Sequence, residues 1–344
     1  MLKKLFLCFS FFMLSLASVY CVTLFVSPLA PVVESAAVSS GAESITVNSD
    51  STEKESQESN ISAVTSATEK AEATAADSTA KGKIISKAIA YNSGNLKYNN
   101  VSVKNITSLS IDLKAELLAG PSIILQNTTE PQVLIMHTHT TECFMLEERD
   151  YYTDSDQTRT TDDSKNIVAV GEVLAKGLEE KGIGVIHATE KHDYPEYTGS
   201  YTRSAATVKK YLEKYPAIKV VIDLHRDAMV DSSGTKTAIV SEINGKKAAQ
   251  VMIVAGCQDK DVTEYPNWRQ NFRLSLKLQQ SMEVMYPGFA RPILFTPRRY
   301  NQHLTNGSIL IECGTDANTL EQAKYSAELL ADCLASTLNM LKES

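Results

Sequence analysis

With 344 residues, the chain is long enough for one large domain or two small ones. Its formal net charge of −7 argues against nucleic acid as a partner, because domains that bind nucleic acid are usually basic. The six cysteines lack the C-x-x-C spacing of zinc ribbons and thioredoxin-like motifs, and they suggest no disulfide framework.

The N-terminus combines two lysines, Lys3 and Lys4, with an uncharged and mostly apolar run from Leu5 to about Ala30. As a helix this run would be about 39 Å long, more than the roughly 30 Å hydrocarbon core of a bilayer. It shows neither the short apolar region nor the small-x-small cleavage site of a signal peptide. We therefore expect residues 1–30 to be a cytoplasmic tip and an uncleaved membrane anchor, with everything that follows outside the cytoplasm.

The next segment, residues 31–83, is rich in Ser, Thr, Ala and Glu, and has no aromatic residue from Glu34 onward. Such a stretch cannot bury enough apolar surface to offset the entropy lost on ordering, so we expect a disordered tether. For about fifty residues its root-mean-square reach is about 40 Å. Residues 84–344 are then expected to form one extracytoplasmic domain.

Within that domain, apolar runs of strand length alternate with stretches of helical spacing. The predicted strands are Val133–Met136, Gly184–Ile186, Ile218–Leu224, Ala238–Ile243, Gln250–Ala255 and Ile309–Ile311. The predicted helices are Asn166–Lys181, Arg203–Tyr215, Asn267–Met285 and Thr319–Leu341. Tyr98–Leu118 is expected to be strand or irregular, and Glu147–Ser164 a polar rim or lid. This order predicts an α/β fold with a mostly parallel sheet flanked by helices, plus a β-hairpin at Asn244-Gly245.

The segment PQVLIMHTHTTECF, residues 131–144, places His137, His139 and Glu142 at the carboxyl end of a strand. Ligands and catalytic groups gather at such ends in α/β proteins. His139 and Glu142 form His-x-x-Glu, a spacing that lets one tight turn direct both side chains to a single cation. Alone the motif is a weak signal, because two common polar residues often meet at this spacing by chance.

Two further strand ends carry residues of the same kind: VVIDLHRD contains His225, and SILIECG contains Glu312. The histidines could instead be ordinary strand-end residues, and Glu312 could pair with an arginine such as Arg226. Three strands are thus followed or ended by residues that can bind a metal, all at the same edge of the sheet. Buried charge is costly unless it is paired or bound to a metal, so this arrangement favours one shared site.

Imidazole and carboxylate ligands suit zinc, and a catalytic zinc needs three protein ligands and an open position for water. We therefore expect His139, Glu142 and His225 as ligands. A fourth protein ligand would leave no room for water, so Glu312 is interpreted as the general base of a metal-assisted amide hydrolysis.

Several neighbouring residues have weaker expected roles. Arg226 could orient a substrate carboxylate, but pairing with Asp227 is favoured. Asn301 and Gln302 are candidates to line the groove. The cysteines that follow the two glutamates, Cys143 and Cys313, should point to the opposite face and serve in packing.

The motifs HTHTTE, DLHRDA and YNQHLTNGSILIECG, followed by a helix, resemble the stage II sporulation protein P family. The resemblance covers about Leu96 to Leu341 and extends to the anchor and tether. It implies a zinc N-acetylmuramoyl-L-alanine amidase that acts on peptidoglycan, with endopeptidase activity on peptide cross-links. It also implies an α/β zinc-amidase fold similar to that of zinc carboxypeptidases. The implied setting is engulfment of the forespore, at the mother-cell membrane facing the intermembrane space, alongside stage II sporulation proteins D and M.

One departure from the broader amidase pattern leaves the ligand set open. There the glutamate ligand opens the first helix, a place nearest Asp162 and Asp163 in this chain, whereas Glu142 follows the carboxypeptidase-like spacing. We favour Glu142 over Asp162, and His139 over His137, with His137 as a group that supports the site or faces the substrate.

Two other functions remain open on the sequence. One is a zinc peptidase that acts on peptide alone and never separates glycan from stem peptide. The other is a catalytically inactive scaffold that binds the cell wall.

Overall fold

The computed structural model describes residues 80–343. The predicted anchor and most of the predicted tether lie outside these residues. Within residues 80–343, no helix is both long enough and apolar enough to span a bilayer.

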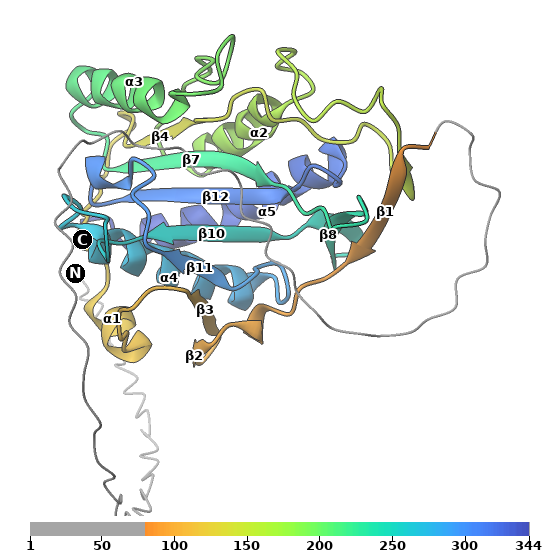
Figure 1. Cartoon of the computed structure of the whole chain (residues 1–344). Coiled ribbons are helices and arrows are strands. Elements are labelled where there is room, and N and C mark those ends of the chain that lie inside the picture. The colour runs from red at the N-terminus through yellow and green to blue at the C-terminus, as the bar shows by residue number, and fades with distance from the viewer. Residues whose placement is uncertain (1–79, 344) are drawn as a thin grey trace, which may run out of the picture. The chain divides into compact units, whose positions relative to one another are not determined.

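The described chain folds into an eight-stranded sheet, a four-stranded sheet and five α-helices (Figure 1). The strands are β1 Gly82–Lys87, β2 Leu96–Tyr98, β3 Val101–Asn105, β4 Val133–Met136, β5 Tyr151–Tyr152, β6 Val185–His187, β7 Val220–Asp227, β8 Lys236–Ile243, β9 Lys246–Ala249, β10 Val251–Gly256, β11 Ile293–Thr296 and β12 Ser308–Thr315. The α-helices are α1 Leu113–Ala119, α2 Ile167–Glu179, α3 Ser200–Lys214, α4 Trp268–Met285 and α5 Leu320–Asn339. Two short 3₁₀ helices are η1 Tyr91–Ser93 and η2 Gln302–Leu304.

The large sheet has the order β2-β3-β11-β10-β12-β7-β4-β6. The β2–β3 and β10–β12 pairs are antiparallel, and its other pairs are parallel, so the predicted mostly parallel sheet is confirmed. The register of its strands brings the predicted site residues next to one another. Glu312 pairs with His225 across β12 and β7, and Met136 pairs with Asp223 across β4 and β7.

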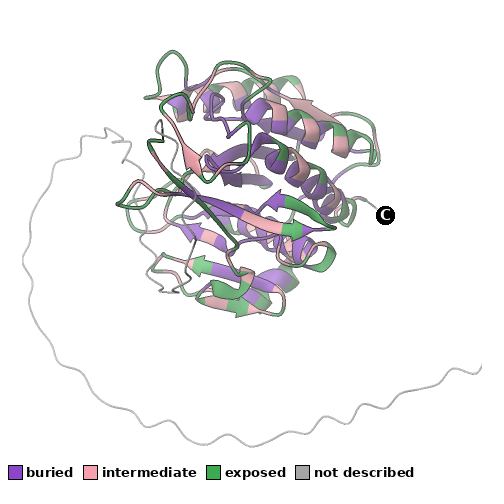
Figure 2. Ribbon diagram, turned by 90° about the vertical axis from the view of Figure 1, so that its right-hand side faces the viewer, coloured by how far each residue is buried: buried purple, intermediate pink, exposed green. Residues whose placement is uncertain are grey.

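Strand β4 is buried on both faces, and alternate side chains enter different clusters. Val133 and Ile135 belong to the main core with α2, α4 and α5, whereas Leu134 and Met136 pack with Val208 of α3. Helices therefore cover both sides of this part of the sheet. Figure 2 shows buried residues through the sheet and the inward helix faces, with exposed residues on the outer loops. This double burial explains why β4 is an uninterrupted apolar run.

The smaller sheet has the order β5-β1-β8-β9. The predicted hairpin turn is confirmed, because Asn244 and Gly245 have φ values of 51° and 74° and connect antiparallel β8 and β9. The predicted partner is wrong in part: β8 pairs with β9, while the next strand, β10, belongs to the large sheet. A single buried residue, Gln250, separates β9 from β10, so both strands fall within one short stretch.

The long helices are confirmed with small shifts in their ends. Helix α2 starts after Asn166, whose side chain accepts from the Val168 N–H, and α5 starts after Thr319 in a capping box with Gln322. The sequence patterns do not predict α1, β1 or β11. Helix α1 is only seven residues long and lies in the stretch expected to be strand or irregular.

Helices α2 and α5 approach closely at Gly177, where a Cβ would lie 2.7 Å from the Ala331 Cβ. We predict that Gly177→Ala lowers the free energy of unfolding. Overpacking costs about 1–3 kcal/mol, whereas the gain in helix propensity is about 1 kcal/mol. Urea unfolding should show the loss, and Gly177→Ala/Ala331→Gly should recover most of it by moving the methyl group to the other helix. If Gly177→Ala alone made the protein more stable than the parent, the close contact between α2 and α5 would be contradicted.

Candidate metal and catalytic site

Three strand ends bring the four predicted residues together. After β4 the chain makes a tight turn in which the Glu142 N–H donates to the His139 carbonyl at 3.2 Å. The ring centroids of His139 and His225 are 5.2 Å apart, and Glu142 Oε2 lies 3.4 Å from His225 Nδ1. Glu312 sits beside His225 in the sheet register. The structure therefore assembles His139, Glu142, His225 and Glu312 at one place.

Glu142 is a buried carboxylate, with 3% of its surface exposed. Its Oε2 accepts from the Arg226 main-chain N–H at 3.1 Å, and its Oε1 lies 3.7 Å from Arg159 Nη2. Burial would raise its pKa, but the Arg226 guanidinium and the two histidines hold the pKa well below the ordinary value. Glu142 is therefore ionised, as a metal ligand must be.

His225 lies between two carboxylates. Its Nδ1 faces Glu142, and its Nε2 is 2.8 Å from Asp223 Oδ1, a close contact that is poorly aligned for a hydrogen bond. Burial lowers the pKa of His225, but Asp223 and Glu142 more than offset this and raise the pKa well above its ordinary value. The surroundings thus stabilise a positive charge at this position, whether a proton or a metal ion supplies it.

His139 is surrounded by tyrosines. Its ring stacks on Tyr197 with centroids 4.7 Å apart and an interplanar angle of 9°, and it meets Tyr201 edge-on at 5.7 Å. The Tyr197 hydroxyl is 3.2 Å from His139 Nε2. Burial lowers the pKa of His139 to about 4, so the ring is neutral and able to bind a metal at neutral pH.

Glu312 differs from Glu142 in its surroundings. Its Oε2 is buried and has no hydrogen-bond partner among the described residues. Burial raises its pKa above the ordinary value, against the opposing effect of His225. A raised pKa brings a carboxylate closer to the range suited to general acid–base catalysis at neutral pH.

The residues match zinc in chemical type. Among residues 80–343, no set of three or more His, Cys, Asp or Glu side chains is already arranged to hold a metal ion. The donors nevertheless comprise two imidazoles and an ionised carboxylate, and two buried polar atoms of the site, His139 Nδ1 and Glu312 Oε2, have no hydrogen-bond partner in the described chain. Unsatisfied buried polar atoms are costly, so their presence here fits a site that binds an additional group.

His137 lies apart from this group. Its Nδ1 is 2.8 Å from the Leu224 carbonyl and its Nε2 is 2.9 Å from His187 Nε2. Both ring nitrogens thus have partners, and complete burial lowers its pKa to about 3. A Cβ on Gly171 would lie 2.8 Å from this ring, so His137 packs against α2. The structure gives His137 a supporting position.

The favoured ion pair of Arg226 with Asp227 is wrong: the contact between the two residues runs from Arg226 Nη1 to the Asp227 main-chain carbonyl, at 3.5 Å. The Asp227 carboxylate pairs with Arg291 at 2.8 Å. The Arg226 guanidinium is buried and donates to main-chain carbonyls, with distances of 3.2 Å to Cys143 and 2.8 Å to Thr158. Arg226 therefore fixes the turn that carries Glu142 and is not placed to hold a substrate carboxylate.

Gln302 and Asn301 also differ from expectation. Gln302 is buried, accepts from the Gly256 N–H at 2.9 Å and donates to the Val254 carbonyl at 2.8 Å, so it does not line a groove. Asn301 has a φ of 56° and donates to the Tyr201 carbonyl at 2.7 Å and to Ser204 Oγ at 3.0 Å. Both residues hold the loop before β12 in place.

The alternative carboxylate, Asp162, is exposed and engages Lys165 at 2.9 Å and its neighbour Ser164. Glu142, and not Asp162, lies beside His225. The expected packing role of Cys143 and Cys313 is confirmed by their burial, and burial raises the pKa values of their thiols to about 11 and 12.

The motifs of the sequence do not point to three parts of the site, namely Asp223, Tyr197 and the pair formed by Arg159 with Asp193. Asp223 had a usable signal, since a residue two positions before His225 points to the same face of a strand. Arg159 Nη1 lies 2.6 Å from the fully buried carboxylate of Asp193, and its guanidinium lies over the Tyr197 ring at 4.7 Å. These contacts join two loops that are distant in sequence, and no spacing rule signals them.

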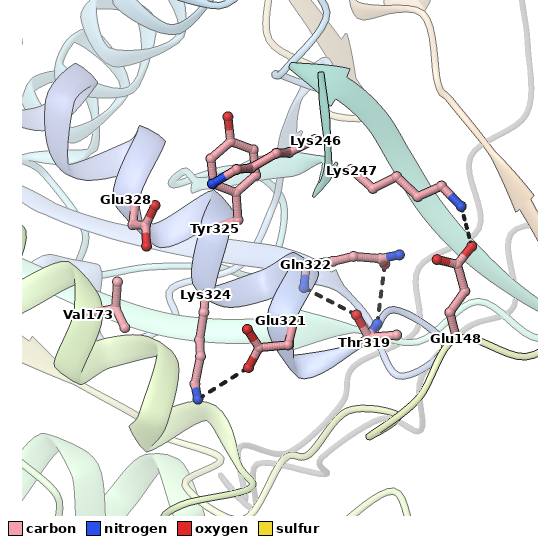
Figure 3. A pocket seen from close by; sticks show the side chains of 10 residues that line it. All are labelled: Glu148, Val173, Lys246, Lys247, Thr319, Glu321, Gln322, Lys324, Tyr325 and Glu328. Atoms are coloured by element: carbon pink, nitrogen blue, oxygen red, sulfur yellow. Dashed lines mark hydrogen bonds and ion pairs between the residues drawn. The ribbon is translucent and has the colours of Figure 1, made fainter. Parts of the chain in front are cut away.

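A separate hollow of about 440 Å³ lies between the start of α5 and the β8–β9 turn (Figure 3). Four of its charged side chains form two ion pairs, Lys247 with Glu148 and Lys324 with Glu321 at 3.6 Å, and Lys246 lies over the Tyr325 ring. None of the four predicted site residues lines it.

Comparison with known proteins gives matches in sequence and in structure. The family model for Stage II sporulation protein P matches residues 30–335. The stage II sporulation protein P of Bacillus subtilis (strain 168) is 30% identical over 211 residues, which cover 58% of this chain and 49% of that protein. The chain thus spans about half the length of this curated relative.

Two similar solved structures are amidases. N-acetylmuramoyl-L-alanine amidase AmiC2 of Nostoc punctiforme has a TM-score of 0.36 and 13% identity, over 63% of this chain and 96% of that one. The CwlD amidase of Clostridioides difficile, solved with the GerS lipoprotein, has a TM-score of 0.37 and 14% identity, over 61% of this chain and 98% of that one.

The Arg226 contacts lead to a stability prediction. Lysine cannot reproduce the planar fork that reaches carbonyls on two segments, so Arg226→Lys should lower the free energy of unfolding by about 1–3 kcal/mol. Arg269→Lys, at a more exposed pair with Glu116, is the control and should change it by less than about 0.5 kcal/mol. Equal losses in the two variants, measured by urea unfolding, would contradict the anchoring role of Arg226.

Proposed function

The chain belongs to the stage II sporulation protein P family, and we propose that it is a zinc-dependent peptidoglycan hydrolase. The observation that supports this proposal most directly is the meeting of His139, Glu142, His225 and Glu312 at three strand ends. A protein that only bound the cell wall would have no need for a buried set of two imidazoles and two carboxylates, because unpaired buried charge is costly.

In this proposal His139, Glu142 and His225 hold the zinc, which when bound lowers the pKa of water and polarises the substrate carbonyl. Glu312 takes the proton from the attacking water and passes it to the leaving amine. Arg226 holds the Glu142 turn through the Cys143 carbonyl, so that the carboxylate stays ionised and in place. The net reaction is hydrolysis of an amide, with water adding to the carbonyl carbon and the C–N bond breaking.

The bond that we propose joins N-acetylmuramic acid to the L-alanine of the stem peptide, with endopeptidase activity on peptide cross-links as a second reaction. Mass spectrometry of cell wall digested by the purified full-length protein tests the assignment. Release of free stem peptides from glycan is the expected product. Cleavage confined to peptide–peptide bonds would identify a zinc peptidase, and no cleavage by zinc-loaded protein would indicate a scaffold.

We further propose that residues 1–30 anchor the protein in the mother-cell membrane, with the hydrolase in the intermembrane space during engulfment. Stage II sporulation proteins D and M are the proposed partners there. A mature protein whose N-terminal sequence began near Pro31 would contradict an uncleaved anchor.

Metal analysis separates the two candidate carboxylate ligands. Glu142→Ala should lower zinc occupancy well below one ion per chain, because it removes the ionised group beside His225. Asp162→Ala is the matched control and should keep its zinc, since Asp162 is exposed and paired with Lys165. Elemental analysis of full-length protein gives the occupancy. Zinc lost from Asp162→Ala and retained in Glu142→Ala would reverse the assignment.

Glu312→Gln tests the base. The amide keeps the size of the side chain but cannot accept the proton, so hydrolysis should fall about 10²–10⁴-fold. Zinc content and binding to insoluble cell wall should stay unchanged, because Glu312 is not assigned as a ligand. Near-normal cleavage would exclude the role of base, and loss of zinc would make Glu312 a ligand.

A further inference from the structure

We propose that the loop between β6 and α3, residues 193–199, binds the glycan side of the substrate, with Tyr194 as the residue that stacks on a sugar ring. This inference rests on the proposed amide hydrolysis and adds the direction in which the substrate crosses the site. Two observations carry it: the order of the strands that hold the site, and an exposed tyrosine on a loop that is fixed beside the site.

The order of the strands places the proposed base at one side of the site. The neighbouring strands run β10-β12-β7-β4-β6 in the large sheet. Glu312 lies on β12 and His225 on β7, and the turn that carries His139 follows β4. Loop 193–199 follows β6 and contacts the β4 turn, so it lies on the side of the site away from Glu312.

The position of Glu312 sets the direction of the substrate. Glu312 passes the proton to the leaving amine, so the nitrogen of the scissile amide must come within hydrogen-bond reach of its carboxylate. In the proposed reaction this amine belongs to the L-alanine of the stem peptide, and the acyl carbon belongs to N-acetylmuramic acid. The stem peptide therefore extends from the site over β12 and β10. The glycan extends the opposite way, over the β4 turn and loop 193–199.

Loop 193–199 is fixed from both of its ends. The Asp193 carboxylate is fully buried and accepts from the Thr141 N–H at 3.1 Å and from the Thr141 hydroxyl at 2.6 Å. At the other end, Arg203 of α3 donates to the His192 carbonyl at 2.6 Å and to two carbonyls within the loop. A side chain that this loop presents is therefore placed before the substrate arrives, which lowers the ordering cost of binding.

Tyr194 is a ring that the loop presents to solvent. It is 57% exposed, and its side chain makes no hydrogen bond or ring contact within residues 80–343. Tyr197 is also on the loop, but it stacks on His139 and the Arg159 guanidinium lies over its ring. The chain from Tyr194 to Tyr197 spans at most about 11 Å. Tyr194 therefore stands at the edge of the site with its ring accessible.

The groups on this loop match the chemistry of a carbohydrate. The face of a pyranose ring carries C–H groups that pack on an aromatic ring, and the hydroxyls around it form hydrogen bonds with polar groups. Tyr194 supplies an aromatic ring with a polar edge. Glu196 and Thr198 are exposed on the same loop and supply a carboxylate and a hydroxyl. The loop thus offers both kinds of contact on the side where the glycan must lie.

Hydrolysis of two soluble substrates by the full-length protein tests the subsite. Both carry the same stem peptide, one on a single N-acetylmuramic acid and the other on a tetrasaccharide of the glycan chain. Tyr194 does not contact a site residue, so its ring should reach only sugars beyond the first. Tyr194→Ala should raise the KM of the tetrasaccharide substrate about threefold to tenfold, the effect of losing one stacking contact. Its kcat, and the KM of the single-sugar substrate, should not change.

Two matched variants separate stacking from a general effect on the fold. Tyr194→Phe keeps the ring and should have the KM of the parent on both substrates. Leu118→Ala, at a side chain of α1 that is 77% exposed, is the control and should change neither KM. The urea unfolding midpoint of Tyr194→Ala should equal that of the parent, because the lost ring is exposed.

An equal rise in KM on both substrates, or no rise on either, would overturn the inference. A rise that followed the length of the stem peptide would also overturn it, because the substrate would then lie in the opposite direction. If the unaltered protein cleaved neither substrate, the proposed hydrolysis would fail, and binding of peptide-free glycan chains would decide the subsite. Tyr194→Ala should bind these chains about threefold to tenfold more weakly than Tyr194→Phe, and equal binding would contradict the subsite.

Discussion

The burial of the Glu142 carboxylate is the constraint on which the rest of the site depends. Removing one unpaired carboxylate from water costs several kcal/mol, so the surrounding structure must supply positive charge and hydrogen-bond donors. The Arg226 main-chain N–H, the Arg159 guanidinium and the His225 ring all lie within 3.7 Å of its oxygens. His225 and Arg226 lie on β7, and Arg159 lies in the loop before α2. The charge of one residue therefore holds the β4 turn, β7 and that loop together.

The parts of the site that sequence predicts are those set by the sheet. Val133–Met136 and Ile309–Ile311 are uninterrupted apolar runs. A strand needs such a run when both of its faces are buried, so the runs indicate the central strands of the sheet. Parallel neighbours align their carboxyl ends, and this alignment puts Glu312 beside His225 without further information. The predicted fold class and the four principal site residues follow from these strand ends.

The parts that sequence does not predict depend on partners from distant segments. Asp227 lies next to Arg226 in the chain, yet its carboxylate pairs with Arg291, which precedes β11. Gln302 has a polar side chain of the kind expected to line a substrate groove. It is instead buried and forms hydrogen bonds with main-chain groups of β10. Neither contact has a local signal in the sequence. The Asp227–Arg291 pair depends on which distant residues the fold brings together, and the Gln302 contacts depend on which main-chain groups of β10 the sheet leaves without partners.

The central claim is that one metal ion joins His139, Glu142 and His225 and leaves Glu312 as the base. Anomalous scattering at the zinc edge, from crystals of the zinc-loaded full-length protein, tests this claim most directly. The account predicts one zinc peak within about 2.0–2.2 Å of a nitrogen of each histidine and of a Glu142 oxygen. It also predicts that Glu312 lies beyond bonding distance. A peak between His137 and His187, or one bound by Asp162, would contradict it.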